Sequence, residues 1–317
     1  MNRPVTIAAI LLVAALTISL ATPHRAVADN GANLTQTTLY GGIGRGPDAD
    51  RGEVITINQT NAQGTLVGAG SSDPAAGITG LAFNTPGQLF AATINAPLLS
   101  PGPVLSTLIR LNPITGGQDT LVGTIRLANN TPVIITELAI QPDTDVLFGI
   151  GINPSNFQTS LYRIDSSTAV ATFVGVTDLE VDALAFGPDG TLYGERAVFD
   201  ETGENFLQGF LITIDPATGA TLTSAGPFFT HLGGMAVRPT DGVIFASGGF
   251  PSDIYTVSPQ GVLTFLGLTS FGGVGDIAFT PLPTSKDQCK DDGWQRFNFP
   301  FSFKNQGDCI QLINTGK

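Results

Sequence analysis

The chain has 317 residues, of which 42% are apolar and only 13% are charged, and it contains 39 glycines and 21 prolines. This composition supplies enough apolar surface for a large core and excludes a mainly disordered chain, while many Gly and Pro among Val, Ile, Leu and Phe favour an all-β fold. The formal net charge of −12 makes bare nucleic acid and anionic lipid surfaces poor partners.

Residues 1–28 have the three parts of a secretory signal peptide: a basic start at Arg3, an apolar run, and the small-x-small cleavage site Ala26-Val27-Ala28. Because the apolar run approaches the roughly 20 residues of a spanning helix, an uncleaved membrane anchor stays an alternative. Cleavage would remove Arg3 and Arg25 and leave 12 of the 14 basic residues against 26 acidic ones, a charge of −14. We therefore expect an extracytoplasmic protein, secreted or associated with the cell envelope, with a leader over 29–36 and no transmembrane segment in the mature chain.

A unit of four short strands repeats through residues 37–281. One strand ends in Asn, Asp or Ser, and its five copies, spaced by 54, 53, 50 and 43 residues, are 54–58, 108–112, 161–165, 211–215 and 254–258. Turn residues and a second strand that ends near a Gly follow each copy. The third strand has Ala at its third position, as expected where two sheets press together and only a methyl group fits: Ala82, Ala139, Ala185, Ala236 and Ala278.

The fourth strand of the unit is missing from the last repeat and is found at the N-terminus instead, at 38–41. A chain that begins with the strand its last repeat lacks can close a ring, so that strand 274–280 joins strands from residues 37–69 in one sheet. These features predict a five-bladed β-propeller closed by N- and C-terminal strands. Six blades are possible if 92–106 or 197–208 hides further strands, and an open stack of β repeats is the other alternative.

A separate C-terminal module is expected over 287–317, after a linker at 282–286. Its two cysteines, Cys289 and Cys309, are the only ones in the chain, and an even pair in an exported protein predicts a disulfide. The aromatic residues of the module form either a small core or a sticky surface toward the envelope or a glycan: Trp294, Phe297, Phe299, Phe301 and Phe303. The module is similar to a short tail found on many bacterial exported proteins.

The repeat phrase Leu184-Ala185-Phe186-Gly187-Pro188-Asp189-Gly190-Thr191-Leu192-Tyr193 resembles the secreted relatives of NHL-repeat and gluconolactonase-like β-propellers, and the resemblance covers roughly residues 37–281. It implies that the Ala-containing strands line the axis of the propeller. In those relatives that act as lactonases or metal-dependent hydrolases, carboxylates and Asn near the axial mouth surround a divalent cation that polarises substrate oxygen.

Four side chains of this chain match that region. Glu137, Asp182 and Asp276 begin axial strands, and His231 lies in the corresponding region of another blade. They are either ligands of Ca²⁺ or another divalent cation, or solvated mouth residues that bond loop amides. Asp182 sits one residue earlier in its strand than the other two carboxylates, and neighbouring side chains face opposite sides of a strand, which argues against convergence.

No catalytic residue is predicted, because no complete catalytic motif accompanies these side chains. His231 is the only histidine of the mature chain, and no Gly-x-Ser-x-Gly elbow occurs. The sequence therefore favours a binding or interaction module at or outside the cell surface, for an unknown protein, glycan or small-molecule ligand. The alternative is a divalent-metal-dependent hydrolase or lactonase with its site at the axial mouth.

Overall fold

The structure is a computed structural model that describes residues 37–44, 50–73, 76–95, 104–152, 159–177, 180–202, 205–248 and 252–316. The predicted signal peptide over 1–28 and the leader over 29–36 lie outside the described residues. Across these described ranges, no helix combines the length and apolarity that crossing a membrane requires.

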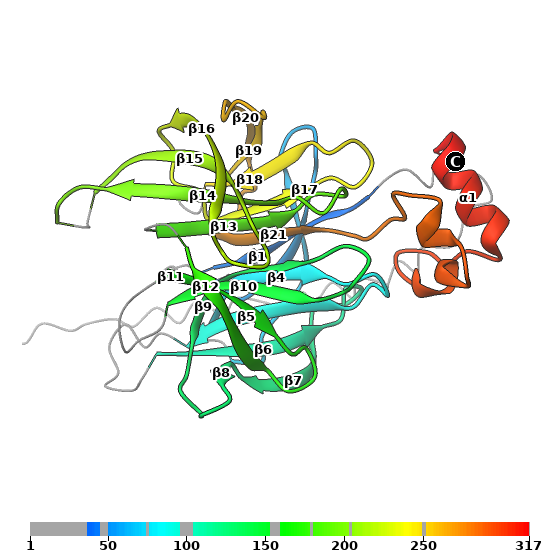
Figure 1. Ribbon diagram of the computed structural model, residues 1–317, viewed down its shortest axis with the longest axis horizontal. Coiled ribbons are helices and arrows are strands. Elements are labelled where there is room, and N and C mark those ends of the chain that lie inside the picture. The colour runs from blue at the N-terminus through cyan, green and yellow to red at the C-terminus, as the bar shows by residue number, and fades with distance from the viewer. Residues whose placement is uncertain are drawn as a thin grey trace, which may run out of the picture. The chain divides into compact units, whose positions relative to one another are not determined.

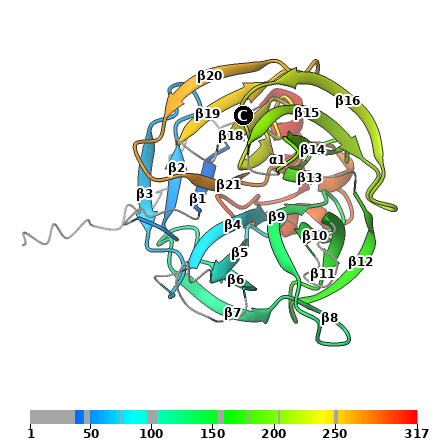
Figure 2. The ribbon, with the colours of Figure 1, turned by 90° about the vertical axis from the view of Figure 1, so that its left-hand side faces the viewer.

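Five β-sheets form the blades of a ring, and each blade is built from four antiparallel strands (Figure 2). From the axis outward, blade 1 contains β21 (Val274–Phe279), β1 (Leu39–Ile43), β2 (Val54–Ile57) and β3 (Gly64–Gly68). Blade 2 contains β4 (Ala76–Phe83), β5 (Leu89–Asn95), β6 (Leu105–Leu111) and β7 (Gln118–Thr124). Blade 3 contains β9 (Ile134–Ile140), β10 (Leu147–Ile152), β11 (Thr159–Ile164) and β12 (Val170–Val176), with the short parallel strand β8 (Arg126–Leu127) added at its outer edge.

Blade 4 contains β13 (Glu180–Phe186), β14 (Leu192–Phe199), β15 (Phe206–Ile214) and β16 (Thr221–Phe228). Blade 5 contains β17 (Gly234–Val237), β18 (Ile244–Ser247), β19 (Asp253–Val257) and β20 (Leu263–Leu268). The inner strands contact one another in the closed order β4, β9, β13, β17, β21 and back to β4. The five-bladed propeller predicted from the repeat is therefore confirmed.

Ring closure uses the strand pair that the sequence predicts. The N-terminal strand β1 lies antiparallel between β21 and β2, with Leu39 opposite Phe279 on one side and Ile57 on the other. The two segments considered for a sixth blade, 92–106 and 197–208, add no blade, because their described residues belong to the hairpins β5–β6 and β14–β15. Each hairpin extends its own blade at the end where the inner strands begin.

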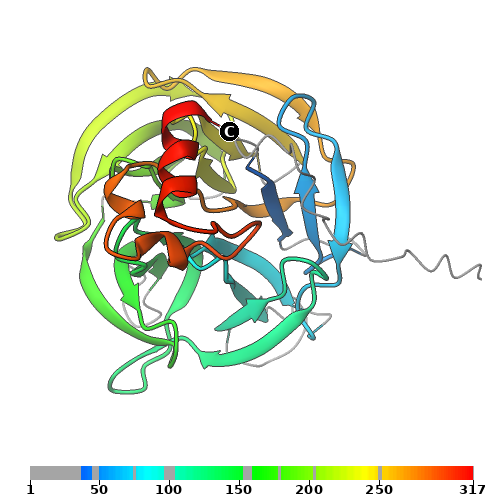
Figure 3. The same cartoon turned by 90° about the vertical axis from the view of Figure 1, so that its right-hand side faces the viewer.

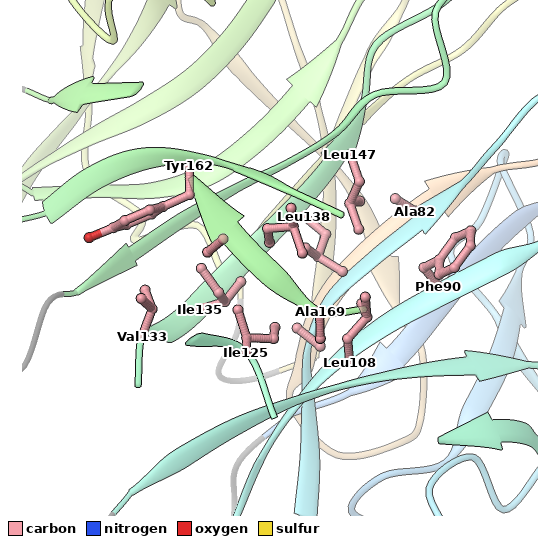
Figure 4. Packing of buried hydrophobic residues seen from close by; sticks show 13 residues of the cluster. Ala82, Phe90, Leu108, Ile125, Val133, Ile135, Leu138, Leu147, Tyr162 and Ala169 are labelled. Atoms are coloured by element: carbon pink, nitrogen blue, oxygen red, sulfur yellow. The ribbon is translucent and has the colours of Figure 1, made fainter. Parts of the chain in front are cut away.

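Small-to-large packing joins neighbouring blades. Ala82 of blade 2 shares one buried cluster with Leu138 of blade 3, and Figure 4 shows both among the larger side chains of that interface. The same contact of an alanine with the Leu, Met or Ile of the next blade recurs at the other four interfaces, as Ala139 with Leu184, Ala185 with Met235, Ala236 with Ile277, and Ala278 with Leu81. The blades thus approach one another so closely at this position that only a methyl group fits, as predicted.

The C-terminal module contains two 3₁₀ turns, η1 (Asp287–Cys289) and η2 (Gly293–Arg296), and the helix α1 (Gln306–Thr315). The predicted disulfide joins Cys289 and Cys309. Its small core is built from residues of all three elements, of the segments between them and of the preceding linker: Leu282, Cys289, Phe297, Phe303, Cys309 and Leu312, with Trp294 and Phe301 packed against them. The small core expected for the aromatic residues is thus confirmed for four of the five.

Phe299 is the exception, because its ring stacks on Phe83 of the propeller at a centroid distance of 5.9 Å. An ion pair of 2.7 Å between Arg296 and Asp145 adds a second contact between the module and the propeller. Both propeller residues lie where inner strands end, and Figures 1 and 3 show the module, coloured orange to red, at that end of the ring. The opposite end, where the inner strands begin, is called the axial mouth below.

Candidate functional site

Irregular pairing at the start of the inner strands decides where the predicted carboxylates point. In β13, Val181 pairs with Arg196 and Leu184 pairs with Gly194, so that two residues, Asp182 and Ala183, lie opposite one. Such a bulge changes the direction of the side chains that it contains. The same bulge occurs in β9 and β21, so Asp182 stays one residue before the position that Glu137 and Asp276 occupy, as the sequence indicates. Asp182 nevertheless acts electrostatically on both Glu137 and Glu195.

Asp276, on β21, is fully buried on the propeller axis. Its Oδ2 accepts the backbone N–H of Leu81 at 2.6 Å, and its Oδ1 accepts that of Ile277 at 2.7 Å. The backbone N–H groups of Leu138 and Met235 also favour its charged form. Burial nevertheless raises the pKa of Asp276 well above its usual range, and these four backbone N–H groups oppose that rise. The oxygens of this carboxylate are thus occupied by the backbone.

Glu137 occupies the same position of β9 that Asp276 occupies in β21, yet its surroundings differ. Its side chain is only 3% exposed, and its Oε2 has no hydrogen-bond partner among the described residues. Burial raises the pKa of Glu137 well above its usual range, and the nearby Asp276, Asp182 and Glu195 raise it further. Without comparable donors, this carboxyl favours its neutral form until a cation approaches.

Glu195 is a further buried acid that the sequence reasoning missed. It lies on β14, and its Oε2 accepts the N–H of Leu232 at 2.9 Å, while its Oε1 is buried without a described partner. Burial raises the pKa of Glu195 well above its usual range, with a contribution from Asp182. The repeat contained a signal, because the matching positions of the other four blades hold small or apolar residues, namely Gly42, Ala92, Ile150 and Ser247.

Asp182 and His231 form the more exposed part of the mouth. The imidazole Nε2 of His231 lies 2.8 Å from Asp182 Oδ2. The His231 side chain is 41% exposed and that of Asp182 is 24% exposed. The rings of Phe199 and Phe206, at the end of the β14–β15 hairpin, lie 5.5 and 5.1 Å from the imidazole. The hairpin that was considered for an extra blade therefore brings two unpredicted aromatic rings to the site.

A divalent cation does not fit these residues as they are arranged. Among the residues that the structure describes, no group of three or more His, Cys, Asp and Glu side chains is placed to hold a metal ion. Asp276 is bonded to backbone amides, and Asp182 is paired with His231. The four predicted residues thus share one end of the axis without forming a set of metal ligands.

An axial cavity of about 140 Å³ lies at the other end of the ring, away from the carboxylates. It is lined by the last residues of the inner strands, including the five alanines of the blade interfaces, and by Leu282, Gln288 and Phe297 next to or within the C-terminal module. Glu137, Asp182 and Glu195 do not line this cavity, whereas Leu81 and Ile277, whose N–H groups bond Asp276, do.

Comparisons with known proteins show no family for this chain. No family model matches the chain, and no curated protein matches it. Solved structures that resemble it include a nidogen/laminin complex, at 10% identity and a TM-score of 0.48, covering 79% of this chain and 100% of that chain. A gluconolactonase from Xanthomonas campestris has 17% identity and a TM-score of 0.43, covering 76% and 80%. A periplasmic gluconolactonase from Pseudomonas aeruginosa has 13% identity and a TM-score of 0.39, covering 77% and 99%.

Proposed function

We propose that this chain is an exported binding protein whose axial mouth takes a cationic ligand. One observation carries the proposal: two buried carboxyl groups, Glu137 and Glu195, each have an oxygen without a described partner. None of the ion pairs within the described ranges joins Lys or Arg to either group. A buried acid without a counter-charge is unfavourable, and a bound cation would supply that charge.

The ligand is a small cation, or a cationic group on a larger molecule. The pair of Asp182 and His231 is more exposed than the buried acids, and the rings of Phe199 and Phe206 lie against the imidazole. Aromatic faces and carboxylates together favour an organic ammonium group. Two features support an extracytoplasmic location, whether secreted or at the envelope: the signal-like sequence over 1–28 and the Cys289–Cys309 disulfide.

A hydrolase or lactonase at the same mouth is the second candidate. It is supported by the 2.8 Å contact between His231 and Asp182, because an imidazole oriented by a carboxylate can accept a proton from water. The divalent cation of the alternative would need Asp182, Glu137 and Glu195 to move into a common ligand set.

Thermal unfolding of the mature chain tests both candidates. The midpoint is measured in EDTA and then with Ca²⁺, Mg²⁺, Zn²⁺ or glucosamine as probes, because a ligand that binds only the folded state raises the midpoint. The test variant is Glu137→Gln with Glu195→Gln, and Glu201→Gln, at an exposed position of the β14–β15 hairpin end, is the charge-matched control.

We expect a probe cation to raise the midpoint of the parent and the control but not of the double variant. If no probe raises the parent's midpoint, cation binding at the mouth is wrong. Hydrolysis of glucono-δ-lactone then separates the candidates. Turnover that depends on the bound cation and is lost in His231→Ala supports the hydrolase, whereas cation binding without turnover supports the binding protein.

A further inference from the structure

The backbone amides of four inner strands converge on one point of the propeller axis. The residues concerned occupy equivalent positions in their blades, directly before the interface alanines: Leu81, Leu138, Met235 and Ile277. An inner strand is the axial edge of its sheet, so alternate N–H groups point away from the sheet and find no ladder partner. Buried amides of this kind need an acceptor.

We propose that these amides form an anion-binding site on the axis, and that the protein's own Asp276 carboxylate occupies it as an internal ligand. Asp276 belongs to β21, and Leu81, which donates to it at 2.6 Å, belongs to β4. The amides of Leu138 in β9 and Met235 in β17 also act on the carboxylate. One side chain therefore bonds the inner strand of blade 2 to that of blade 1 and interacts with the inner strands of blades 3 and 5. The pairing of β1 with β21 closes the ring through the sheet, and Asp276 closes it at the centre.

The residues beside the carboxylate leave room for it. The position of Asp276 is occupied by Gly234 in β17 and by Gly80 in β4. A Cβ atom added at Gly234 would lie 2.6 Å from Asp276 Oδ1, and one added at Gly80 would lie 2.9 Å from the Leu138 nitrogen. Either contact would force the carboxylate or an amide to shift, so the two glycines make the site possible. This assignment differs from that of a cation ligand, the role the sequence suggested for Asp276.

Chemical rescue tests the proposal. Asp276→Gly removes the internal ligand and leaves the amide ring, whereas Glu137→Gly removes an equally buried acid from the equivalent position of β9 as the matched control. Thermal unfolding is followed at pH 7 in sodium formate and in sodium chloride of equal ionic strength. We expect Asp276→Gly to lower the midpoint by about 10 °C. Formate should restore several degrees of that loss while leaving the parent and Glu137→Gly unchanged.

Asp276→Asn provides a second test, since the Asn side chain has the same size as that of Asp but offers only one acceptor oxygen. We expect its midpoint to lie between those of the parent and Asp276→Gly. A parent-like midpoint for Asp276→Asn, or equal effects of formate on Asp276→Gly and Glu137→Gly, would overturn the proposal. If Asp276→Gly does not fold, its yield on refolding from denaturant is compared in formate and in chloride, and equal yields would overturn the proposal as well.

Discussion

Raising the pH should destabilise the folded chain, and the two buried glutamates should be the cause. Burial raises the pKa values of Glu137 and Glu195 well above the ordinary 4.5. Above pH 4.5 the unfolded chain has released both protons, while the folded chain retains them. Unfolding in this range therefore releases protons, and the free energy of unfolding falls as the pH rises, until the folded groups ionise or a cation replaces their protons.

The magnitude follows from the number of protons held. Each retained proton gives a slope of about 1.4 kcal/mol per pH unit, so two give about 2.7 kcal/mol per unit. Burial also raises the pKa of Asp276, but Asp276 is present in the parent and in every variant below, so the differences in slope between these proteins do not depend on it. Asp165 and Asp241 have pKa values below the ordinary 3.8 because of hydrogen bonds, so their stabilisation is lost only at lower pH, outside this window.

Urea unfolding at pH 5.5, 6.5 and 7.5, followed by far-ultraviolet circular dichroism, measures this slope. We expect Glu137→Gln and Glu195→Gln each to reduce it by about 1.4 kcal/mol per unit, and each to be more stable than the parent at pH 7.5. Glu201→Gln, at an exposed position, should keep the parental slope. A free energy of unfolding that rises with pH across this range, or one slope shared by all four proteins, would refute the reasoning.

Two further predictions concern the ends of the fold. Cys309→Ser opens a disulfide between residues 20 apart in sequence, which should destabilise the module by about 3 kcal/mol. The fluorescence of Trp294, the only tryptophan, should therefore change at a lower denaturant concentration than the circular dichroism of the propeller. Coincident transitions would contradict a module with its own core. Leu39→Ala truncates a side chain that is 0% exposed at the ring closure, and should lower the free energy of unfolding by about 2–5 kcal/mol. Leu222→Ala, at a position that is 65% exposed, should change that free energy by less than about 0.5 kcal/mol in the same urea titration. Equal effects would argue against closure through β1.

The fold could be predicted because its information is repeated. Each blade carries the same small residue at its interface, and Ala82 and Ala139 have equivalent partners in the next blade. The displaced copy of one strand at 38–41 predicted how the ring closes, because a strand with no partner in its own repeat must pair elsewhere. A periodic pattern of this kind depends on side-chain size and spacing, which a sequence displays directly.

The site was less predictable, because it depends on departures from that pattern. The imidazole of His231 reaches Asp182 from another blade, a contact that is visible only once the blades are placed side by side. Glu195 lies in a strand that the repeat assigns to the second layer, so it was not considered as an axial residue. Phe299 shares its spacing with the core aromatics of the module but packs on Phe83 of the propeller instead.

Glu137 and Asp276 show most clearly why residue type and position in the repeat are insufficient to predict the surroundings of a side chain. They occupy the same position in two inner strands and are equally buried, yet backbone amides bond to Asp276 while an oxygen of Glu137 has no described partner. Amide donors oppose the rise that burial causes in the pKa of Asp276, and negative charge on Asp276 favours the neutral form of Glu137. A cation that binds at the mouth must displace the protons of Glu137 and Glu195, so its affinity should rise with pH. The stability of the ligand-free chain falls over the same range, and the bound cation would therefore stabilise the fold most where the buried acids destabilise it most.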